Sequence, residues 1–166
     1  NFDTKTTGID IVGRMPLDLG AGNTSVALAM NYNNTTVTNS GRILPLTANR
    51  RNELEKRLPK WKGNIMFTHE QGMWRGLARV NYHSSWLDVN SPPSRPNQQM
   101  SSEITIDLEA GAQVTENVEV IIGAANVLDN FPDENLTATR IGQLYASQAP
   151  FGFNGGSYYA KLRITY

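Results

Sequence analysis

The residues able to carry out chemistry are few, and their spacing assembles no reactive site. The sequence has two histidines and no cysteine, which excludes thiolate metal sites, thiol nucleophiles and disulfides. An imidazole can bind a metal, but no third ligand accompanies His69 and His83. Gly152, Gly155 and Gly156 lead into an extended segment rather than a helix, so they form no dinucleotide-binding fingerprint. We find no nucleophile–base pair or paired carboxylates, and we expect neither an enzyme nor a bound metal or cofactor.

Charged side chains recur at every second position of several segments. The main members of this set are Arg75, Arg79, Asp107, Glu109, Glu119, Lys161 and Arg163. Alternate positions of a strand project from one face, so we expect these residues to share a face, with Arg163 beside Glu119 and Asp107. The face could pair with another part of the protein or guide a charged ligand, but a solvated wall of mixed charge is the simpler interpretation.

The elements that must position these residues are predicted by period-two alternation of apolar and polar residues. Seven such segments are residues 8–15, 25–33, 61–67, 73–86, 103–114, 117–124 and 157–166. Short connections (17–24, 69–72, 114–117) alternate with long ones (38–60, 89–102, 130–156). This order predicts an all-β antiparallel meander with tight turns at one end and large loops at the other, which is typical of outer-membrane barrels.

Composition narrows the class of protein. The 166 residues carry 15 basic and 15 acidic side chains, so the sequence offers no basic surface for nucleic acid. No apolar run approaches the ~20 residues of a membrane-spanning helix. Transmembrane barrels stay possible, because alternating strands have a low mean hydropathy, here −0.41. The first residues contain neither an initiator methionine nor a signal peptide, so we expect the chain to be cut from something longer.

Two interpretations of the alternation compete: a soluble β-sandwich with a buried apolar face, and a membrane barrel with that face in lipid. Aromatic residues near strand ends favour the barrel, since they suit the two membrane interfaces. They are Phe67, Trp74 and Tyr166 near the short turns, and Trp61, Tyr82 and Tyr158, with Tyr32 and Trp86, near the long loops. Small residues on the apolar face and runs of about 9–12 residues also favour the barrel.

Four stretches carry a resemblance to a known family. Residues 123–132 (GAANVLDNFP), 150–159 (PFGFNGGSYY), 162–166 (LRITY) and 54–63 (LEKRLPKWKG) occur in the order and spacing of motifs in the barrel of TonB-dependent outer-membrane receptors. The chain resembles the C-terminal portion of that barrel over nearly its whole length. Val127-Leu128 stands where Leu-Phe is commoner, and Ser157 where Arg is often found.

The resemblance implies that residues 1–166 form the last third of a 22-stranded barrel, with the plug domain and TonB box upstream. It implies a bacterial outer-membrane receptor for TonB-dependent active uptake of a scarce ligand, most often a ferric siderophore or similar iron complex. The implied partners are the plug, the remaining strands, outer-membrane lipid and periplasmic TonB. The energy would come from the inner-membrane proton gradient, and the terminal Tyr166 would be an assembly signal.

Extracellular loops bear ligand contacts in such receptors. The candidates here are Trp86, Arg95, Tyr145, Phe151 and Phe153. We also expect a loop helix over residues 49–58, ended by Pro59, as a lid or, more simply, as a solvated helix. Two alternatives stay open: a passive porin or smaller outer-membrane barrel, and a secreted β-sandwich binding module.

Overall fold

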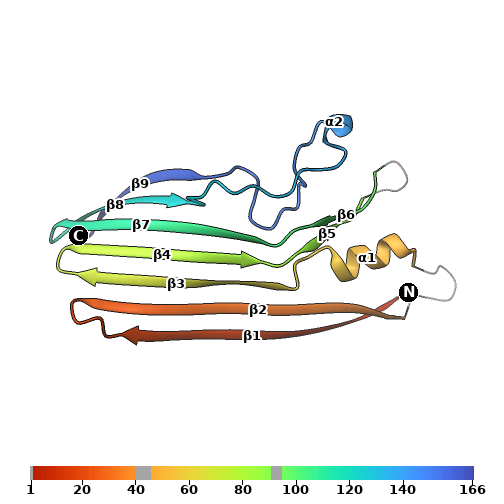
Figure 1. Ribbon diagram of the computed structural model, residues 1–166. Coiled ribbons are helices and arrows are strands. Elements are labelled where there is room, and N and C mark those ends of the chain that lie inside the picture. Colours follow the sequence, from red (N-terminus) through yellow and green to blue (C-terminus); the bar gives the residue numbers. More distant parts are fainter. Residues whose placement is uncertain (1, 40–45, 91–94) are drawn as a thin grey trace.

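The computed structural model describes residues 2–39, 46–90 and 95–166, and its main element is one antiparallel sheet. Within these residues seven strands form the sheet in the order β1–β2–β3–β4–β7–β8–β9 (Figure 1). Their bounds are β1 Asp3–Leu17, β2 Asn23–Asn39, β3 Trp61–Gln71, β4 Trp74–His83, β7 Glu103–Thr115, β8 Val118–Ala125 and β9 Ser157–Ile164. Each strand pairs with its neighbours in chain order, apart from a small hairpin between β4 and β7. The predicted all-β antiparallel meander is confirmed.

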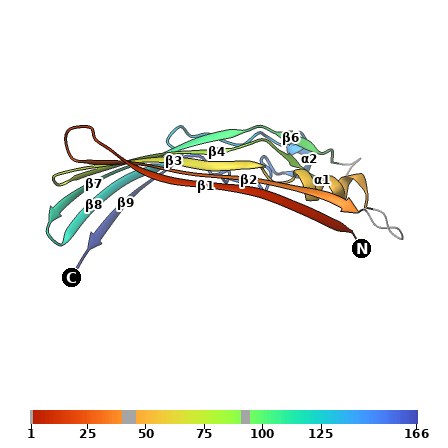
Figure 2. The same cartoon turned by 90° about the horizontal axis from the view of Figure 1, so that it is seen from below.

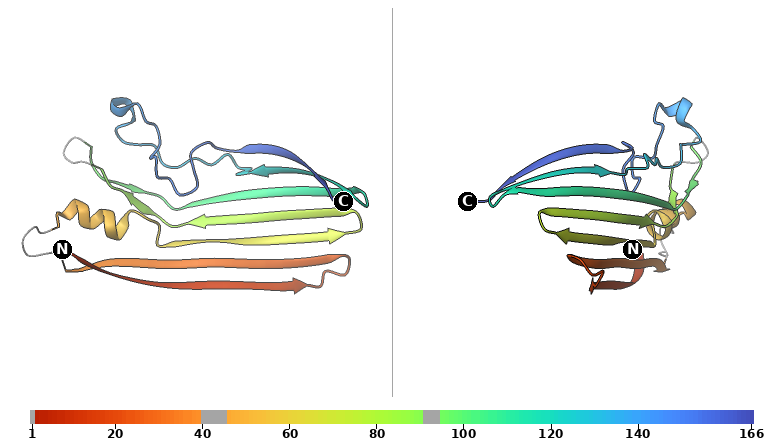
Figure 3. Two further views of the ribbon diagram at one scale, coloured as in Figure 1. Left: turned by 180° about the vertical axis from the view of Figure 1, so that it is seen from behind. Right: turned by 60° about the vertical axis from the view of Figure 1, so that its left-hand side comes forward.

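The two ends of the sheet differ as predicted. All the tight turns lie at the end where the C-terminus is found, and the long connections and the N-terminus lie at the other end (Figure 1). The sheet is a single curved and twisted layer, and the described residues place no second layer of strands on it (Figures 2 and 3). The end with the tight turns is called the turn end below, and the other the loop end.

The first two strands are longer than the predicted 9–12 residues. They have 15 and 17 residues and continue beyond the other strands at the loop end (Figure 1). The extension pairs residues 3–7 with residues 34–39, which are mostly Thr and Asn and therefore carry no apolar alternation. The predicted segment stops at residue 15, but β1 continues through Pro16, which an edge strand tolerates because proline lacks only the donor N–H.

The predicted strand over residues 73–86 is interrupted. β4 ends at His83, and after two residues a short hairpin begins, formed by β5 (Trp86–Asp88) and β6 (Gln98–Met100). The reason is packing: Trp86 is 3% exposed and forms a small core with Met100 and Ala146 at the loop end. This core lies in the loops, and no cluster of described residues on the apolar side of the sheet is as deeply buried.

Two short helices complete the described residues. α1 (Ala48–Lys56) corresponds to the helix predicted over residues 49–58, and Thr47 caps it by accepting a hydrogen bond from the Arg50 amide at 3.2 Å. α2 (Ala138–Ile141) lies in the longest connection and was not predicted. Neither helix of the described residues has the length and apolar character needed to cross a membrane.

Candidate functional site

One face of the sheet, called the apolar face below, is hydrophobic across all seven strands. The register aligns one complete row of residues: Met15, Val26, Phe67, Ala78, Leu108, Ala124 and Tyr158. Side chains of this face stay open to the surroundings, for example Ile122 at 61% and Leu162 at 63% exposure. A monomeric soluble protein rarely leaves so large a continuous apolar surface uncovered.

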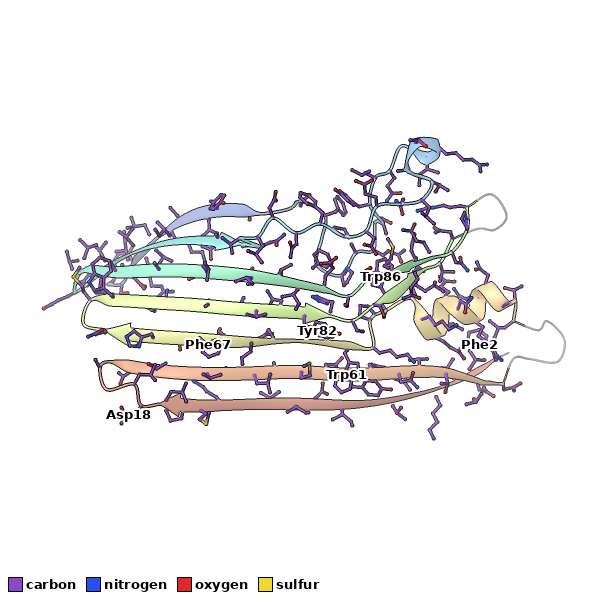
Figure 4. The ribbon with its side chains drawn as sticks, viewed as in Figure 1. Phe2, Asp18, Trp61, Phe67, Tyr82 and Trp86 are labelled. Carbon is purple, nitrogen blue, oxygen red and sulfur yellow. The ribbon has the colours of Figure 1, made fainter. Side chains whose placement is uncertain are left out.

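The predicted interface aromatics lie at several levels of the apolar face. Trp61 and Tyr82 lie toward the loop end, and Phe67 lies nearer the turn end (Figure 4). Trp61 packs on Tyr32, with ring centroids 4.7 Å apart. Trp74 begins β4 at the turn end and is 63% exposed.

Two of the aromatics are placed differently from the prediction. Tyr158 shares its cross-strand row with Phe67 and not with Trp61, because it lies opposite Ala124, which the register places level with Leu108, Ala78 and Phe67. Trp86 leaves the apolar face altogether and is buried in the loops (Figure 4). Tyr166 follows β9 and is fully exposed.

The opposite face, called the polar face, carries all seven predicted charged residues, and they are ion-paired with one another. Glu119 is central: its Oε1 lies 3.1 Å from Arg75 Nε and its Oε2 lies 2.6 Å from Arg163 Nη1. Glu109 lies 3.7 Å from Arg75 Nη2 and 3.5 Å from Lys161 Nζ. We call these five residues, with the pair below, the ion-paired wall.

The remaining charge pair of the wall corrects one prediction. Asp107 pairs with Arg79 at 3.8 Å and not with Arg163. The cause is register, because Arg79 lies opposite Asp107, whereas Glu119 and Arg163 lie level with Gln113, roughly 20 Å further along β7. The expected contact between Arg163 and Glu119 is present.

The ion-paired wall can orient charged groups, but it contains no arrangement suited to catalysis. Its groups are neutralised by one another, and no side chain is held as a base beside a nucleophile. Within the described residues, no group of three or more His, Asp or Glu side chains is placed to hold a metal ion. His69 bonds Thr24 at 2.8 Å near the turn end, far from His83 at the end of β4.

The predicted loop contacts fall into three groups. Trp86 is buried, and Arg95 bonds Asp88 at 3.5 Å within the β5–β6 hairpin. Tyr145 stacks on Phe131 at 5.6 Å. Phe151 lies beside His83, with ring centroids 6.1 Å apart, and Phe153 is 47% exposed. Only the last two therefore present an aromatic surface near the polar face or to the outside.

Helix α1 joins the loops together, which sequence reasoning missed. Asn49 donates to the Asn90 carbonyl at 2.6 Å and accepts from Asn97 at 2.7 Å. Glu55 accepts from the Val37 amide at 2.8 Å, which ties the helix to β2. Arg57 bonds Gln148 in the longest loop. Such contacts join residues that are distant in the sequence, so no local sequence pattern predicts them.

Two of the resembling stretches, 123–132 and 150–159, bind each other. Asn126 and Asp129 have positive φ (50° and 55°), which Asn and Asp tolerate better than other side chains. The Asp129 carboxylate accepts a hydrogen bond from the Gly156 amide at 2.7 Å. A Cβ atom at Gly155 would overlap the side chains of Asp129 and Phe131, and this residue has a positive φ of 68°. The glycines therefore allow the last loop to close onto the end of β8.

The comparisons with known proteins give a fold and no family. The chain matches no family model, and no curated protein matches it. Among solved structures it is similar to the copper transporter OprC, with a TM-score of 0.62 and 19% sequence identity. The match covers 100% of this chain and 25% of that one, so the chain spans about a quarter of the transporter's length. At this identity the likeness establishes the shared fold, an antiparallel meander.

Proposed function

We propose that the chain is part of a large transmembrane β-barrel of the bacterial outer membrane. The observation that carries this proposal is the seven-strand apolar row, which stays exposed while the opposite face is charged and internally paired. A sandwich would bury the apolar face against a second sheet. The apolar face would instead contact lipid, and the polar face would line a water-filled lumen.

The open edges of β1 and β9 support completion of the barrel by more of the same polypeptide. Unpaired strand edges are very costly in a bilayer, because no water satisfies their N–H and C=O groups. The proposal therefore includes further strands and a plug domain that fills a lumen of this size. The ion-paired wall would face that plug.

We further propose that the protein takes up a scarce ligand by TonB-dependent active transport. The resemblance of residues 123–132 and 150–159 to receptor motifs supports this, as does the fold shared with a copper transporter. The ligand would be captured at the loop end and released by plug rearrangement as periplasmic TonB pulls. A ferric siderophore or similar iron complex is the ligand we propose, and copper is the competing candidate.

Transport assays on cells test this proposal. Cells with and without the full-length gene would be given iron-55 complexed by a panel of siderophores, or copper, with matched strains lacking TonB. We expect uptake of one iron complex to require both the gene and TonB, and to stop when an ionophore collapses the proton gradient. Gene-dependent uptake that continues without TonB would instead indicate a passive porin. A protein that folds as a monomer without detergent would indicate the sandwich.

A further inference from the structure

The polar face has a second charged region that the ion-paired wall does not use. It lies at the loop end, where Lys62 on β3 is directly opposite His83 on β4 and Asn64 is the next residue of the same face. Three hollows of about 290, 310 and 410 Å³ adjoin there. His83 lines all three hollows, and Lys62 lines the first two.

The donors in this region are unsatisfied. Within the part of the chain that the structure describes, the Lys62 ammonium has no ion pair, whereas the cations Arg75, Arg79, Lys161 and Arg163 all do. Among the described residues Arg14, at the turn end of the same face, also has no ion pair, but it bonds Ser25 at 3.3 Å. A lysine ammonium without such a partner is free to bind an anion.

The neighbouring acidic groups do not supply the missing partner. Asp10 accepts a hydrogen bond from Asn31 at 2.7 Å. Asp107 accepts from Asn81 at 2.9 Å and from the Asn126 amide at 3.0 Å, in addition to its pair with Arg79. The groups that the described residues leave without a hydrogen-bond or ion-pair partner include the ammonium of Lys62, the side-chain amide of Asn64 and the imidazole of His83, and the Glu103 carboxylate lies opposite His83 on β7.

An aromatic ring adjoins these donors. Phe151, from the last loop, lies 6.1 Å from the His83 ring and lines the 410 Å³ hollow. Its ring supplies a flat apolar surface beside the cation, and planar groups pack well on such a surface. A cation, an amide and an aromatic ring together match a ligand whose charge adjoins a planar ring.

We propose that Lys62, Asn64, His83 and Phe151, here called the His83 site, bind the carboxylate of an aromatic acid or of a larger ligand that ends in one. The carboxylate lies against Lys62 and Asn64, and the ring lies against Phe151. This inference rests on the proposed function, in which the polar face lines the lumen and its loop end is the outer end. It assigns a class of ligand to that end of the polar face.

Ligand-observed saturation-transfer NMR on the full-length protein in detergent tests the site with simple probes. Benzoate carries both recognised features, benzyl alcohol lacks the charge, acetate lacks the ring, and glucose is a neutral polyol. We expect benzoate to bind best. A lost charge-assisted hydrogen bond weakens binding roughly tenfold or more, so Lys62→Gln should weaken benzoate by about that factor and Lys62→Arg should restore most of it. Phe151→Leu should weaken benzoate but not acetate.

Lys5→Gln is the matched control, since Lys5 is an exposed lysine on the edge strand β1, and it should leave binding unchanged. Equal binding of benzoate and benzyl alcohol, stronger binding of glucose, or benzoate binding unaffected by Lys62→Gln would each overturn the His83 site. If benzoate binds as expected but uptake does not need TonB, only the proposed transport mechanism fails. If uptake needs TonB but benzoate does not bind, only the His83 site fails.

Discussion

The Tyr159 hydroxyl donates a hydrogen bond to Glu109 at 2.7 Å, although a whole strand separates the two residues. Tyr159 lies on β9 and Glu109 on β7, and the residue of β8 opposite both is Gly123. The phenol ring lies over this glycine, where a Cβ atom would overlap it. Lys161 Nζ lies 4.3 Å from the centre of the same ring. Because Gly123 on β8 has no side chain, Tyr159 of β9 can reach across it to Glu109 of β7. This contact links the three strands and helps to fix their register.

Filling that space should loosen the coupling. We expect Gly123→Ala to displace the Tyr159 ring, break its bond to Glu109 and lower the free energy of unfolding by about 1–3 kcal/mol. The urea midpoint of the full-length protein in lipid measures this. Gly76→Ala is the control, because a Cβ there meets no atom within 4 Å. If both variants unfold at the wild-type urea concentration, the ring does not depend on the glycine.

Glu119 should matter more than the cations around it. Its side chain is only 10% exposed and serves both Arg75 and Arg163, whereas Arg163 is 62% exposed. Glu119→Gln should therefore cost about 1–3 kcal/mol of unfolding free energy. Arg163→Gln should cost less than about 1 kcal/mol, because water screens an exposed pair and Glu119 keeps Arg75. Chemical unfolding of the two variants side by side decides the order, and the reverse order would contradict a central role for Glu119.

Period-two alternation was sufficient to predict the strands and their faces. It places Ile122 and Leu162 on the apolar face and Arg163 and Glu119 on the polar face, because side-chain direction follows directly from strand geometry. It was not sufficient to pair residues across strands. The register places Glu119 opposite Gln113 and Asp107 opposite Arg79, so Asp107 pairs with Arg79 instead.

The loops were less predictable for a different reason. The alternation of β4 continues in the sequence through Trp86, but burial of that ring against Met100 bends the chain into a hairpin. The side chain of Asn49 bonds the Asn90 carbonyl and the Asn97 side chain, which lie 41 and 48 positions away in the sequence. Lys62 was not singled out either, since its lack of an ion pair depends on which neighbours the register gives it.

Acid should release helix α1 only at low pH. The hydrogen bond from Arg50, with the charges of Arg50 and Arg57, holds the pKa of Glu53 below its ordinary value of 4.5. A lowered pKa in the folded state means that the stabilisation is present above the ordinary value and is lost as the pH falls through the folded one. A nitroxide on a single cysteine at position 48 should therefore keep its mobility from pH 7 to 5 and become more mobile below that range.

The substitution Glu53→Gln is the control for this titration. It removes the titrating carboxylate, so the nitroxide should be mobile at every pH and show no transition. A transition of equal size and position in Glu53→Gln would mean that another group controls the helix.

Adjacent residues of β1 test which side of the sheet meets lipid. Ile11 is 49% exposed on the apolar face, and Val12 is 82% exposed on the polar face beside Asp10 and Arg14. On a protein surrounded by water, arginine at either exposed position would change stability by less than about 0.5 kcal/mol. In a membrane, Ile11→Arg should cost about 2–4 kcal/mol, because arginine near the bilayer midplane is poorly solvated, while Val12→Arg faces the wet side and is tolerated.

Urea unfolding of the full-length protein from lipid vesicles, with the amount of folded protein in the outer-membrane fraction, measures both variants. Equal tolerance of the two arginines would contradict the assignment of the apolar face to lipid, and a larger loss from Val12→Arg would place the lipid on the opposite side.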